Sequence, residues 1–524
     1  MEIDYYKNPF ASKRMNVIVR NGVVCTGNNL ATQAGLRMLL QGGNAVDAAI
    51  ATAACLTVVE PCSNGLGSDG FAIVWMKDKM YGMNSSGHSP YAISADQIDE
   101  IPKRGWIPVT VPGAVKGWKA LSERFGSLPF KKLLEPAIDY ARNGYPVSAE
   151  IARMWKKALN AIPNSEEFKG WYETFTFDGK TPEPGQMICM PKLADALEKI
   201  ADTNTDALYY GELASRIDEE SRKFGGFLRK QDLMDHVVEW VEPIHVNYHG
   251  YQVWELPPNG QGIVALMALN ILNNFQFKTR DVDCIHTQME ALKMAFADAK
   301  EYVTDPKCME MPVRDLISVD YGKQRANQIK HTALPPRKDK PHGSGTVYLC
   351  TADKDGNMVS YIQSNYMGFG SGIVVDGVSL QNRGYDFSLD PTHVNYLMPH
   401  KKTYHTIIPG FLTKDNKPIG PFGVMGGYMQ PQGHMQVVTN MIDFHLNPQM
   451  ALDAKRFQWI ENKKFILEPG FDENIISELK KRGHEIEIEE ELAMFGRGQI
   501  IVRLENGVYI AGCESRTDSN IACY

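Results

Sequence analysis

The chain has 524 residues, enough for several cores, and its 43% hydrophobic and 22% charged residues are ordinary for a globular protein. Its formal net charge of −7 supplies no basic surface, which argues against nucleic acid as the main partner. The nine cysteines, an odd number, are scattered without CxxC pairs. This pattern favours reduced thiols in a cytoplasm over a disulfide framework or a zinc site.

The sequence predicts a cytoplasmic protein with no membrane association. The first ten residues, MEIDYYKNPF, are acidic and aromatic and lack the apolar region of a secretory signal. The longest apolar stretch, 45–59, contains Asp47 and is too short to span a bilayer, so we expect it to form a buried helix.

Patterns of apolar residues predict helices and strands along most of the chain. A hairpin is expected over 17–26, followed by a helix to residue 40 that Asn29 caps. Further helices are expected at 44–59, twice within 109–147, over most of 150–235, and at 263–274, 284–303 and 472–482. Strands cluster near 17–82, 245–256 and 346–424, which predicts stacked sheets covered by helices on both outer faces.

A second hairpin carries the most informative pattern. Thr346 opens an alternating strand, Asp355-Gly356 marks the turn, and 358–364 returns before the glycine-rich MGFGSG. A basic, proline-bearing run at 331–342 precedes this hairpin and is expected to be an exposed linker. A cut before Thr346 would place a hydroxyl nucleophile beside a free α-amine, whose pKa near ~8 suits a base. The alternative is an ordinary strand threonine.

A glycine pair in GVMGGYMQPQGH (423–434) is the second informative element. Gly426 and Gly427 lie between an expected buried strand and an expected helix. Backbone N–H groups at a helix N-terminus can form an oxyanion hole. The alternative is a turn that needs glycine for its positive φ.

In chain order, these segments resemble the γ-glutamyltranspeptidase (γ-glutamyltransferase, glutathione hydrolase) family of N-terminal-nucleophile hydrolases. The resemblance covers nearly the whole chain and is carried by QGGNAVDAAIA, EPCSNGLGSDGF, VPGAVKGW, PAIDYARNGYPVS, PPNGQG, EALKMAFAD, the Thr346 hairpin with FGSG, and the glycine pair. The segments QSNYMGFGSG, LQNRGYDFSLDP, YHTIIPG and MGGYMQPQGH look most like the cytoplasmic, acylase-like members.

The resemblance implies an α+β fold, a four-layer αββα sandwich, and self-cleavage between Gly345 and Thr346. The large subunit would be 1–345 and the small subunit 346–524, and the two would stay associated in one compact body, with a homodimer as one option.

It also implies roles for individual residues. Thr346 would be the nucleophile, Ser364 the hydroxyl that supports it, and Gly426 and Gly427 the oxyanion donors. Asp386 falls where the family binds the α-ammonium group of the substrate, which is sensible for a charge-assisted bond.

The chain departs from the family at the substrate pocket. The family arginine for the α-carboxylate is replaced by Ser86, with His88 as the nearest basic residue, and a neutral histidine offers no bidentate clamp. Two family side chains near the ammonium group are replaced by Tyr366 and Arg383, and the twin-serine motif is replaced by a stretch that contains His405 and Thr406. The first glycine loop has Ser68-Asp69 where the family is richer in glycine. The hypothesis is that Arg383 takes over carboxylate binding.

The sequence therefore predicts an autoprocessing amidohydrolase that hydrolyses, and can transfer, γ-glutamyl or similar acidic acyl groups from a small-molecule amide. A glutaryl-type (cephalosporin) acylase and a non-processing binding relative are the alternatives. We expect no cofactor and no metal, because His245 and His249 lie in a strand-like stretch, roughly 13 Å apart.

Overall fold

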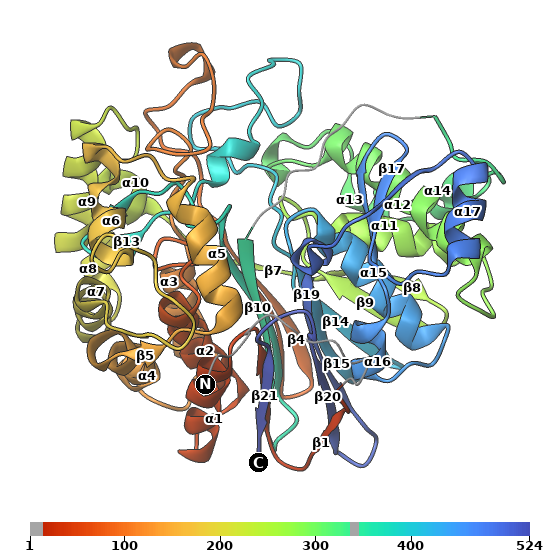
Figure 1. Cartoon of the computed structure of the whole chain (residues 1–524), viewed down its shortest axis with the longest axis horizontal. Helices are drawn as coiled ribbons and strands as arrows, with labels where there is room; N and C mark the ends of the chain where they lie inside the picture. The colour runs from red at the N-terminus through yellow and green to blue at the C-terminus, as the bar shows by residue number, and fades with distance from the viewer. Residues whose placement is uncertain (1–13, 336–344) are drawn as a thin grey trace.

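Two seven-stranded antiparallel sheets lie face to face at the centre of the computed structural model, which describes residues 14–335 and 345–524 (Figure 1). The first sheet has the order β1 (Val17–Val19), β20 (Tyr509–Cys513), β19 (Arg497–Arg503), β15 (Lys417–Met425), β14 (Gly410–Lys414), β9 (Tyr251–Glu255) and β8 (Ile244–Tyr248). The second has the order β21 (Asn520–Cys523), β2 (Val23–Thr26), β10 (Gly345–Ala352), β11 (Met358–Tyr366), β3 (Asp69–Met76), β4 (Lys79–Ser85) and β7 (Glu239–Val241). Apolar side chains such as Phe71, Tyr348 and Phe411 fill the space between the sheets.

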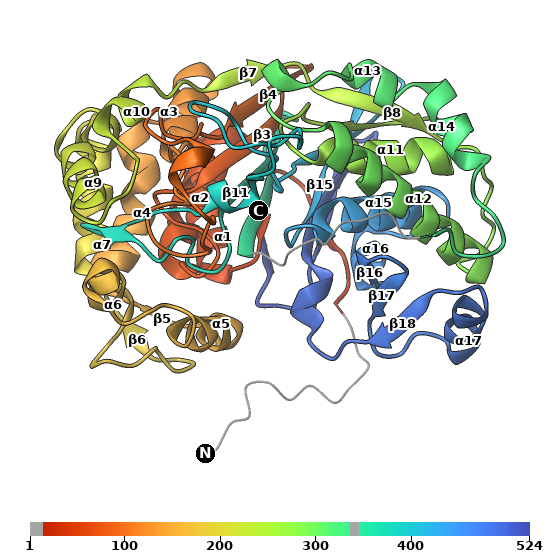
Figure 2. The same cartoon turned by 90° about the horizontal axis from the view of Figure 1, so that it is seen from above.

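Helices cover the outer face of each sheet, so the layers run helix, sheet, sheet, helix (Figure 2). On the second sheet lie α1 (Asn29–Leu40), α2 (Ala45–Val59) and α3 (Ala114–Phe125), with α4 (Phe130–Asn143) packed on α2. On the first lie α11 (Gly262–Leu272), α15 (Met429–Ile442) and α16 (Pro448–Asp453), with α12 (Val282–Tyr302) packed on α11. This layer order confirms the expected αββα sandwich.

The remaining elements are shorter or peripheral. The helices are α5 (Ala149–Leu159), α6 (Lys169–Phe175), α7 (Pro191–Asp202), α8 (Asp206–Tyr209), α9 (Glu212–Lys223), α10 (Lys230–Asp235), α13 (Val313–Leu316), α14 (Val319–Ala326) and α17 (Glu473–Lys481). The strands are β5 (Tyr145–Pro146), β6 (Met187–Ile188), β12 (Val374–Val375), β13 (Val378–Ser379), β16 (Phe457–Glu461), β17 (Lys464–Leu467) and β18 (Glu485–Ile488). The 3₁₀ turns of the described residues are η1 (Ala95–Gln97), η2 (Glu166–Phe168), η3 (Pro306–Cys308), η4 (Arg383–Asp386) and η5 (Leu492–Phe495).

Local sequence explains why α2 forms where the pattern predicts it. The Asn44 side chain accepts hydrogen bonds from the N–H groups of Val46 and Asp47, and the Asp47 carboxylate accepts from the Asn44 N–H at 2.9 Å. This reciprocal capping box fixes the helix start. All 15 residues of α2 are buried, because the helix lies between the second sheet and helices α1 and α4.

Two local predictions are wrong. Residues 17–26 do not form a hairpin, because β1 pairs with β20 in the first sheet while β2 pairs with β10 and β21 in the second. The chain crosses from one sheet to the other at this point. The cap of α1 is Asn28 rather than Asn29, since the Asn28 side chain accepts from the Leu30 N–H at 2.9 Å.

Strands β10 and β11 place the expected nucleophile in the middle of the four layers. Both strands are buried along their whole length, because a helical layer covers one face and the other sheet covers the opposite face. Of the linker expected at 331–342, residues 336–342 lie outside the described part of the chain.

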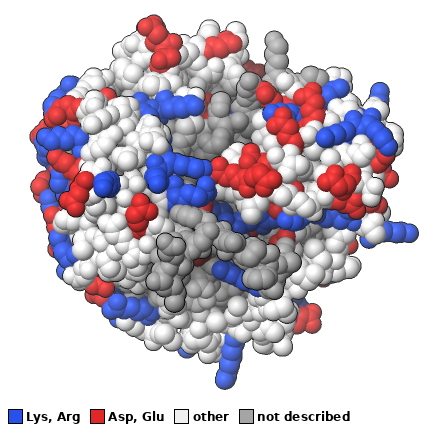
Figure 3. Space-filling view, viewed as in Figure 1, with Lys and Arg blue, Asp and Glu red and all other residues white. Residues whose placement is uncertain are grey.

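No helix among residues 14–335 and 345–524 is long and apolar enough to cross a bilayer. On the face shown in Figure 3, the basic and acidic side chains of the described residues are intermingled. This matches a composition of 55 Lys and Arg against 62 Asp and Glu.

Candidate active site

Thr346 and Ser364 face each other at one end of the β10–β11 ladder. The register of this ladder shifts between Gly345 and Val347, so Thr346 lies in a β-bulge or similar irregularity. Bulges redirect a side chain and are common beside active sites. Thr346 Oγ1 lies 3.0 Å from Ser364 Oγ, and both residues are fully buried.

The Ser364 hydroxyl connects the Thr346 hydroxyl to the peptide bond that precedes it. Ser364 Oγ donates to the Gly345 carbonyl oxygen at 2.8 Å and accepts from the Tyr366 N–H at 2.8 Å. Because a serine hydroxyl has one proton, the remaining contact requires that Thr346 Oγ1 donate to Ser364 Oγ. The Thr346 hydroxyl, the Ser364 hydroxyl that accepts a hydrogen bond from it and the Gly345 carbonyl group therefore lie in one hydrogen-bonded chain.

The glycine pair lies between β15 and α15, as expected. Gly426 and Gly427 have φ values of 141° and 59°, which favour glycine, and their carbonyl groups accept from the first N–H groups of α15. Within the described residues, the N–H groups of Gly426 and Gly427 donate to no other group. Strand β15, which leads into the glycine pair, packs against β10, the strand of Thr346, across the two sheets.

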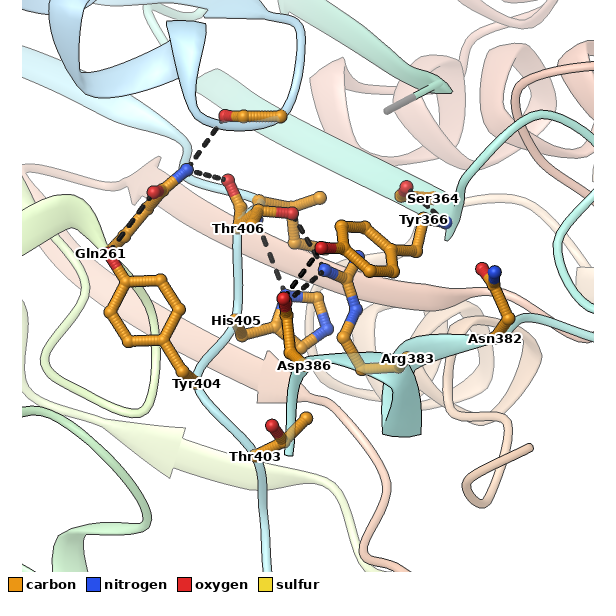
Figure 4. Close-up of polar contacts among 12 residues, drawn as sticks. Gln261, Ser364, Tyr366, Asn382, Arg383, Asp386, Thr403, Tyr404, His405 and Thr406 are labelled. Atoms are coloured by element: carbon orange, nitrogen blue, oxygen red, sulfur yellow. Dashed lines mark hydrogen bonds and ion pairs between the residues drawn. The ribbon is translucent and has the colours of Figure 1, made fainter. Parts of the chain in front are cut away.

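Arg383 and Asp386, at the two ends of η4, form a buried charged pair (Figure 4). Arg383 Nη1 lies 3.7 Å from Asp386 Oδ2 and donates to Thr406 Oγ1 at 2.7 Å. The guanidinium lies over the Tyr366 ring, 4.1 Å from its centroid, and the Tyr366 hydroxyl donates to Asp386 Oδ1 at 2.6 Å. The structure thus brings four of the expected pocket residues together.

This pair keeps unused hydrogen-bonding capacity. Among the described residues, Nε and Nη2 of Arg383 and Oδ2 of Asp386 are buried without a hydrogen-bond partner. Burial lowers the pKa of the Arg383 guanidinium, and the Asp386 carboxylate opposes that shift. Unused donors beside an unused acceptor suit a ligand that carries a carboxylate, an ammonium group or both.

Tyr366 joins this pocket to the pair of hydroxyl groups. Its φ of 75° is in the left-handed region, which non-glycine residues adopt rarely and at a cost of about 1–2 kcal/mol. Its N–H donates to Ser364 Oγ while its hydroxyl donates to Asp386. Backbone strain is therefore retained where the pocket meets the hydroxyl pair.

His405 lies beside the pocket but is already paired. Its Nε2 lies 2.9 Å from Asp69 Oδ2, and its Nδ1 accepts from the Ile407 N–H at 3.3 Å. Burial lowers the pKa of His405, and burial raises the pKa of Asp69 to about 7. Both ring nitrogens are thus used within the protein, so the imidazole offers none to a ligand.

His88 is not brought into the Arg383–Asp386 pocket. Its ring stacks on the His400 ring, with centroids 4.1 Å apart, and His400 in turn stacks on Tyr91. Burial lowers the pKa of His88 to about 3, so a cationic His88 is disfavoured. Ser86, at the position of the family arginine, donates to the Asn84 side chain at 2.7 Å.

The sequence alone missed three side chains at the site. The Tyr428 hydroxyl donates to Asp386 Oδ1 at 3.3 Å and accepts from Lys300 Nζ at 2.6 Å. Gln261 Nε2 donates to the carbonyl oxygens of Thr406 at 2.6 Å and Gly427 at 2.8 Å. Tyr428 directly follows the glycine pair, which is a usable signal, whereas no local pattern marks Lys300.

One group of potential metal ligands occurs among the described residues, away from these elements. His286 and Glu290 of α12 and His484 offer ligand atoms within 4.8 Å of one another. However, His286 Nδ1 and His484 Nε2 are 2.8 Å apart, and the Lys293 ammonium lies 2.7 Å from Glu290 Oε1. Hydrogen bonding and an ion pair therefore account for this cluster.

Comparisons with known proteins show which family the chain belongs to. A family model described as Gamma-glutamyltranspeptidase matches residues 31–524. The Glutathione hydrolase-like YwrD proenzyme of Bacillus subtilis is 38% identical over 522 residues, covering 96% of this chain and 98% of that protein. The Oxamate amidohydrolase proenzyme of Klebsiella pneumoniae is 31% identical over 525 residues, covering 96% and 98%.

A solved structure is similar along the whole chain. The crystal structure of cephalosporin acylase from Bacillus halodurans superposes with a TM-score of 0.97 at 50% identity, covering 100% of this chain and 99% of that one. With the family model matching nearly the whole chain, the protein belongs to the gamma-glutamyltranspeptidase family of N-terminal-nucleophile hydrolases.

Proposed function

We propose that Thr346 is the nucleophile of an autoprocessing amidohydrolase and first acts on its own chain. Thr346 Oγ attacks the carbonyl carbon of Gly345, and the bond from that carbon to the Thr346 nitrogen breaks. The proton lost by Oγ ends on that nitrogen, and an ester forms on the threonine oxygen. Water then hydrolyses the ester, which leaves a Gly345 carboxylate and a Thr346 α-amine. The observation that carries the proposal is the Ser364 hydroxyl, which bonds to both the attacking oxygen and the attacked carbonyl group.

In the mature enzyme, the Thr346 α-amine takes the proton from Oγ as that oxygen attacks the substrate amide. The N–H groups of Gly426 and Gly427 hold the oxyanion, and the amine delivers the proton to the leaving nitrogen. Water then hydrolyses the acyl-threonine. We propose hydrolysis as the main outcome, with transfer to an amino acceptor as a secondary one.

We propose that the acyl group ends in a carboxylate bound by Arg383. The unused Nε and Nη2 donors of this buried guanidinium support the assignment, since charge-assisted bonds to a carboxylate would satisfy both. The unused Asp386 Oδ2 lies beside them and suits an α-ammonium group. A γ-glutamyl group carries an α-carboxylate and an α-ammonium group on the same carbon atom, and it is therefore the preferred substrate group.

A glutaryl-type acyl group, which lacks the ammonium, is the second candidate. Asp386 is already neutralised in part by Arg383 and accepts hydrogen bonds from two phenols. The similarity to a protein described as a cephalosporin acylase points the same way.

We propose that the fragments 1–345 and 346–524 remain associated after cleavage. Strand β10 of the small fragment pairs with β2 of the large one, and β11 pairs with β3, so the second sheet is built from both. We also propose a cytoplasmic location, which nine unpaired cysteines support.

Rates with three p-nitroanilides test the substrate assignment: γ-glutamyl, glutaryl and uncharged butyryl. Because a charge-assisted hydrogen bond contributes about 1.5–3 kcal/mol, we expect both acidic amides to exceed the butyryl amide by about 10- to 100-fold in kcat/KM. Arg383→Ala is expected to remove that advantage. Asp386→Asn is expected to affect the γ-glutamyl amide more than the glutaryl amide. Equal cleavage of the butyryl amide would contradict the proposal.

A further inference from the structure

We propose that the buried Asp69–His405 pair is a positioning unit that fixes the distance between Arg383 and Thr346 and thereby sets the length of the accepted acyl chain. This inference rests on the proposed function, in which Arg383 holds a carboxylate and Thr346 attacks the acyl carbonyl.

The first half of the link runs from the nucleophile to Asp69. In the β3–β11 ladder, Asp69 lies directly opposite Ser364, whose hydroxyl lies 3.0 Å from Thr346 Oγ1. Side chains of directly opposed residues in an antiparallel pair lie on the same face of the sheet. The Asp69 carboxylate is therefore held by the same ladder that holds the two hydroxyl groups.

The second half runs from His405 to Arg383. The Ile407 N–H donates to His405 Nδ1, so the ring carries its proton on Nε2 and donates it to Asp69 Oδ2 at 2.9 Å. The next residue, Thr406, accepts from Arg383 Nη1 at 2.7 Å (Figure 4). Two side-chain hydrogen bonds and one peptide unit thus connect the guanidinium to β3, the strand that pairs with the strand of Ser364.

The residues that connect β3 to the guanidinium are held in place by burial and by further hydrogen bonds. Asp69, His405, Thr406 and Arg383 are all fully buried. Asp69 Oδ1 also accepts from the Gly87 N–H at 3.3 Å, and the Thr406 carbonyl group is held by Gln261 at 2.6 Å. Burying a carboxyl group such as that of Asp69 costs free energy. A histidine partner with a fixed tautomer holds this group in one orientation.

A fixed distance between the two ends has a consequence for specificity. In a fitted pocket, one methylene group more or less changes kcat/KM by about 10- to 200-fold. With Arg383 held to the sheet that carries Thr346, only one number of methylene groups lets the carboxylate and the scissile carbonyl bind together. A movable Arg383 would accept several lengths.

The test measures kcat/KM for succinyl, glutaryl and adipyl p-nitroanilides, with the butyryl amide as the uncharged reference. For the wild type we expect one length to exceed its neighbours by about tenfold or more. His405→Leu removes the link and is expected to bring the three lengths within about threefold of one another. His405→Gln keeps an N–H near the Nε2 position and is expected to retain the preference. The matched control is Glu255→Gln, since the buried Glu255–His434 pair (2.6 Å) joins β9 to α15 instead.

A wild type that cleaves the three acyl lengths with similar kcat/KM would overturn the inference. A processed His405→Leu enzyme that keeps the wild-type preference for one acyl length, with all rates lowered together, would also overturn it. If His405→Leu does not process, Asp69→Ser breaks the same contact from the other side. The proposed function fails separately, when the butyryl amide is cleaved as fast as the acidic amides whatever their length.

Discussion

The hydroxyl group of Ser364 donates a hydrogen bond to the carbonyl oxygen of Gly345 at 2.8 Å, within the peptide bond that would be cut. The same hydroxyl lies 3.0 Å from Thr346 Oγ1. One side chain therefore polarises the electrophile and accepts a hydrogen bond from the nucleophile. This relationship makes Ser364 the residue whose removal separates self-cleavage from folding.

Ser364→Ala is expected to slow self-cleavage and leave the fold intact. Removing one donor to a developing oxyanion typically costs on the order of 10²–10³ in rate, so a large fraction of the variant should remain uncut shortly after synthesis. Ser364→Thr keeps the hydroxyl and is the control. The fraction cut is followed with time by denaturing electrophoresis, and equal rates for Ser364→Ala and wild type would refute the role.

The glycine pair is expected to tolerate substitution unequally. An added Cβ at Gly426, where φ is 141°, would lie 3.1 Å from the Gly496 Cα, so Gly426→Ala should impair folding. Gly427 has a φ of 59°, where alanine costs about 1–2 kcal/mol, so Gly427→Ala should still fold. Relief of this strain would turn the Gly427 N–H and is expected to lower kcat.

Gly179→Ala is the control for this pair, because its φ of 74° imposes the same strain with no atom near the added Cβ. Thermal melts and kcat measure the two effects. Because alanine keeps the backbone N–H, a Gly427→Ala enzyme with full kcat would show that the added methyl group does not turn this N–H away from the oxyanion.

Tyr428→Phe is expected to weaken binding of the γ-glutamyl amide. The phenol links Lys300 to Asp386, and a net hydrogen bond contributes about 0.5–1.5 kcal/mol, so KM should rise about two- to tenfold with little change in kcat. Tyr404→Phe is the matched control, since its ring lies 6.0 Å from that of Tyr428 and nearly parallel to it. Equal effects of both variants on KM would argue against a specific role for the Tyr428 hydroxyl.

The Glu514 carboxyl group is expected to make the stability of the protein depend on pH in the acid range. Burial alone would raise the pKa of its carboxyl group, but Arg456 and Arg516 outweigh burial and lower it from 4.5 to about 2. A lowered folded-state pKa stabilises the protein above pH 4.5, and this contribution is lost as the pH falls toward about 2.

Glu514→Gln should reduce the free energy of unfolding by about 3–5 kcal/mol near neutral pH and should remove this part of the acid sensitivity. The reason is that the buried Arg456 loses its carboxylate partner and Arg516 keeps only Glu468. Urea titrations across this pH range measure both effects. Glu219→Gln, at a mostly exposed pair with Arg216, should have little effect. If both variants behave alike, the buried Glu514 pair is not a stabilising unit.

Sequence reasoning succeeded where the signal is local. The capping residues and apolar composition of 44–59 specify α2 without reference to the rest of the chain. The glycine pair and the Thr346 hairpin likewise carry their geometry within a few residues. In each case, neighbouring residues alone determine the backbone conformation.

Sequence reasoning failed where the contacting residues are far apart in the sequence. The strand at 17–19 does not pair with its neighbour because strand pairing depends on the whole sheet, which periodicity does not encode. Asp69 and His405 are 336 residues apart, and Lys300 and Tyr428 are 128 apart, so neither contact leaves a local pattern. His88 was expected near the substrate because of its chain position, but it stacks on His400 instead.

Intact-mass spectrometry of the wild type beside Thr346→Ala tests whether Thr346 cuts its own chain. Two wild-type fragments are expected, one ending at Gly345 and one beginning at Thr346, and a single uncut chain is expected for the variant. A wild type that stays whole on long incubation, or a Thr346→Ala variant that is cut at the same bond, would contradict self-cleavage by Thr346.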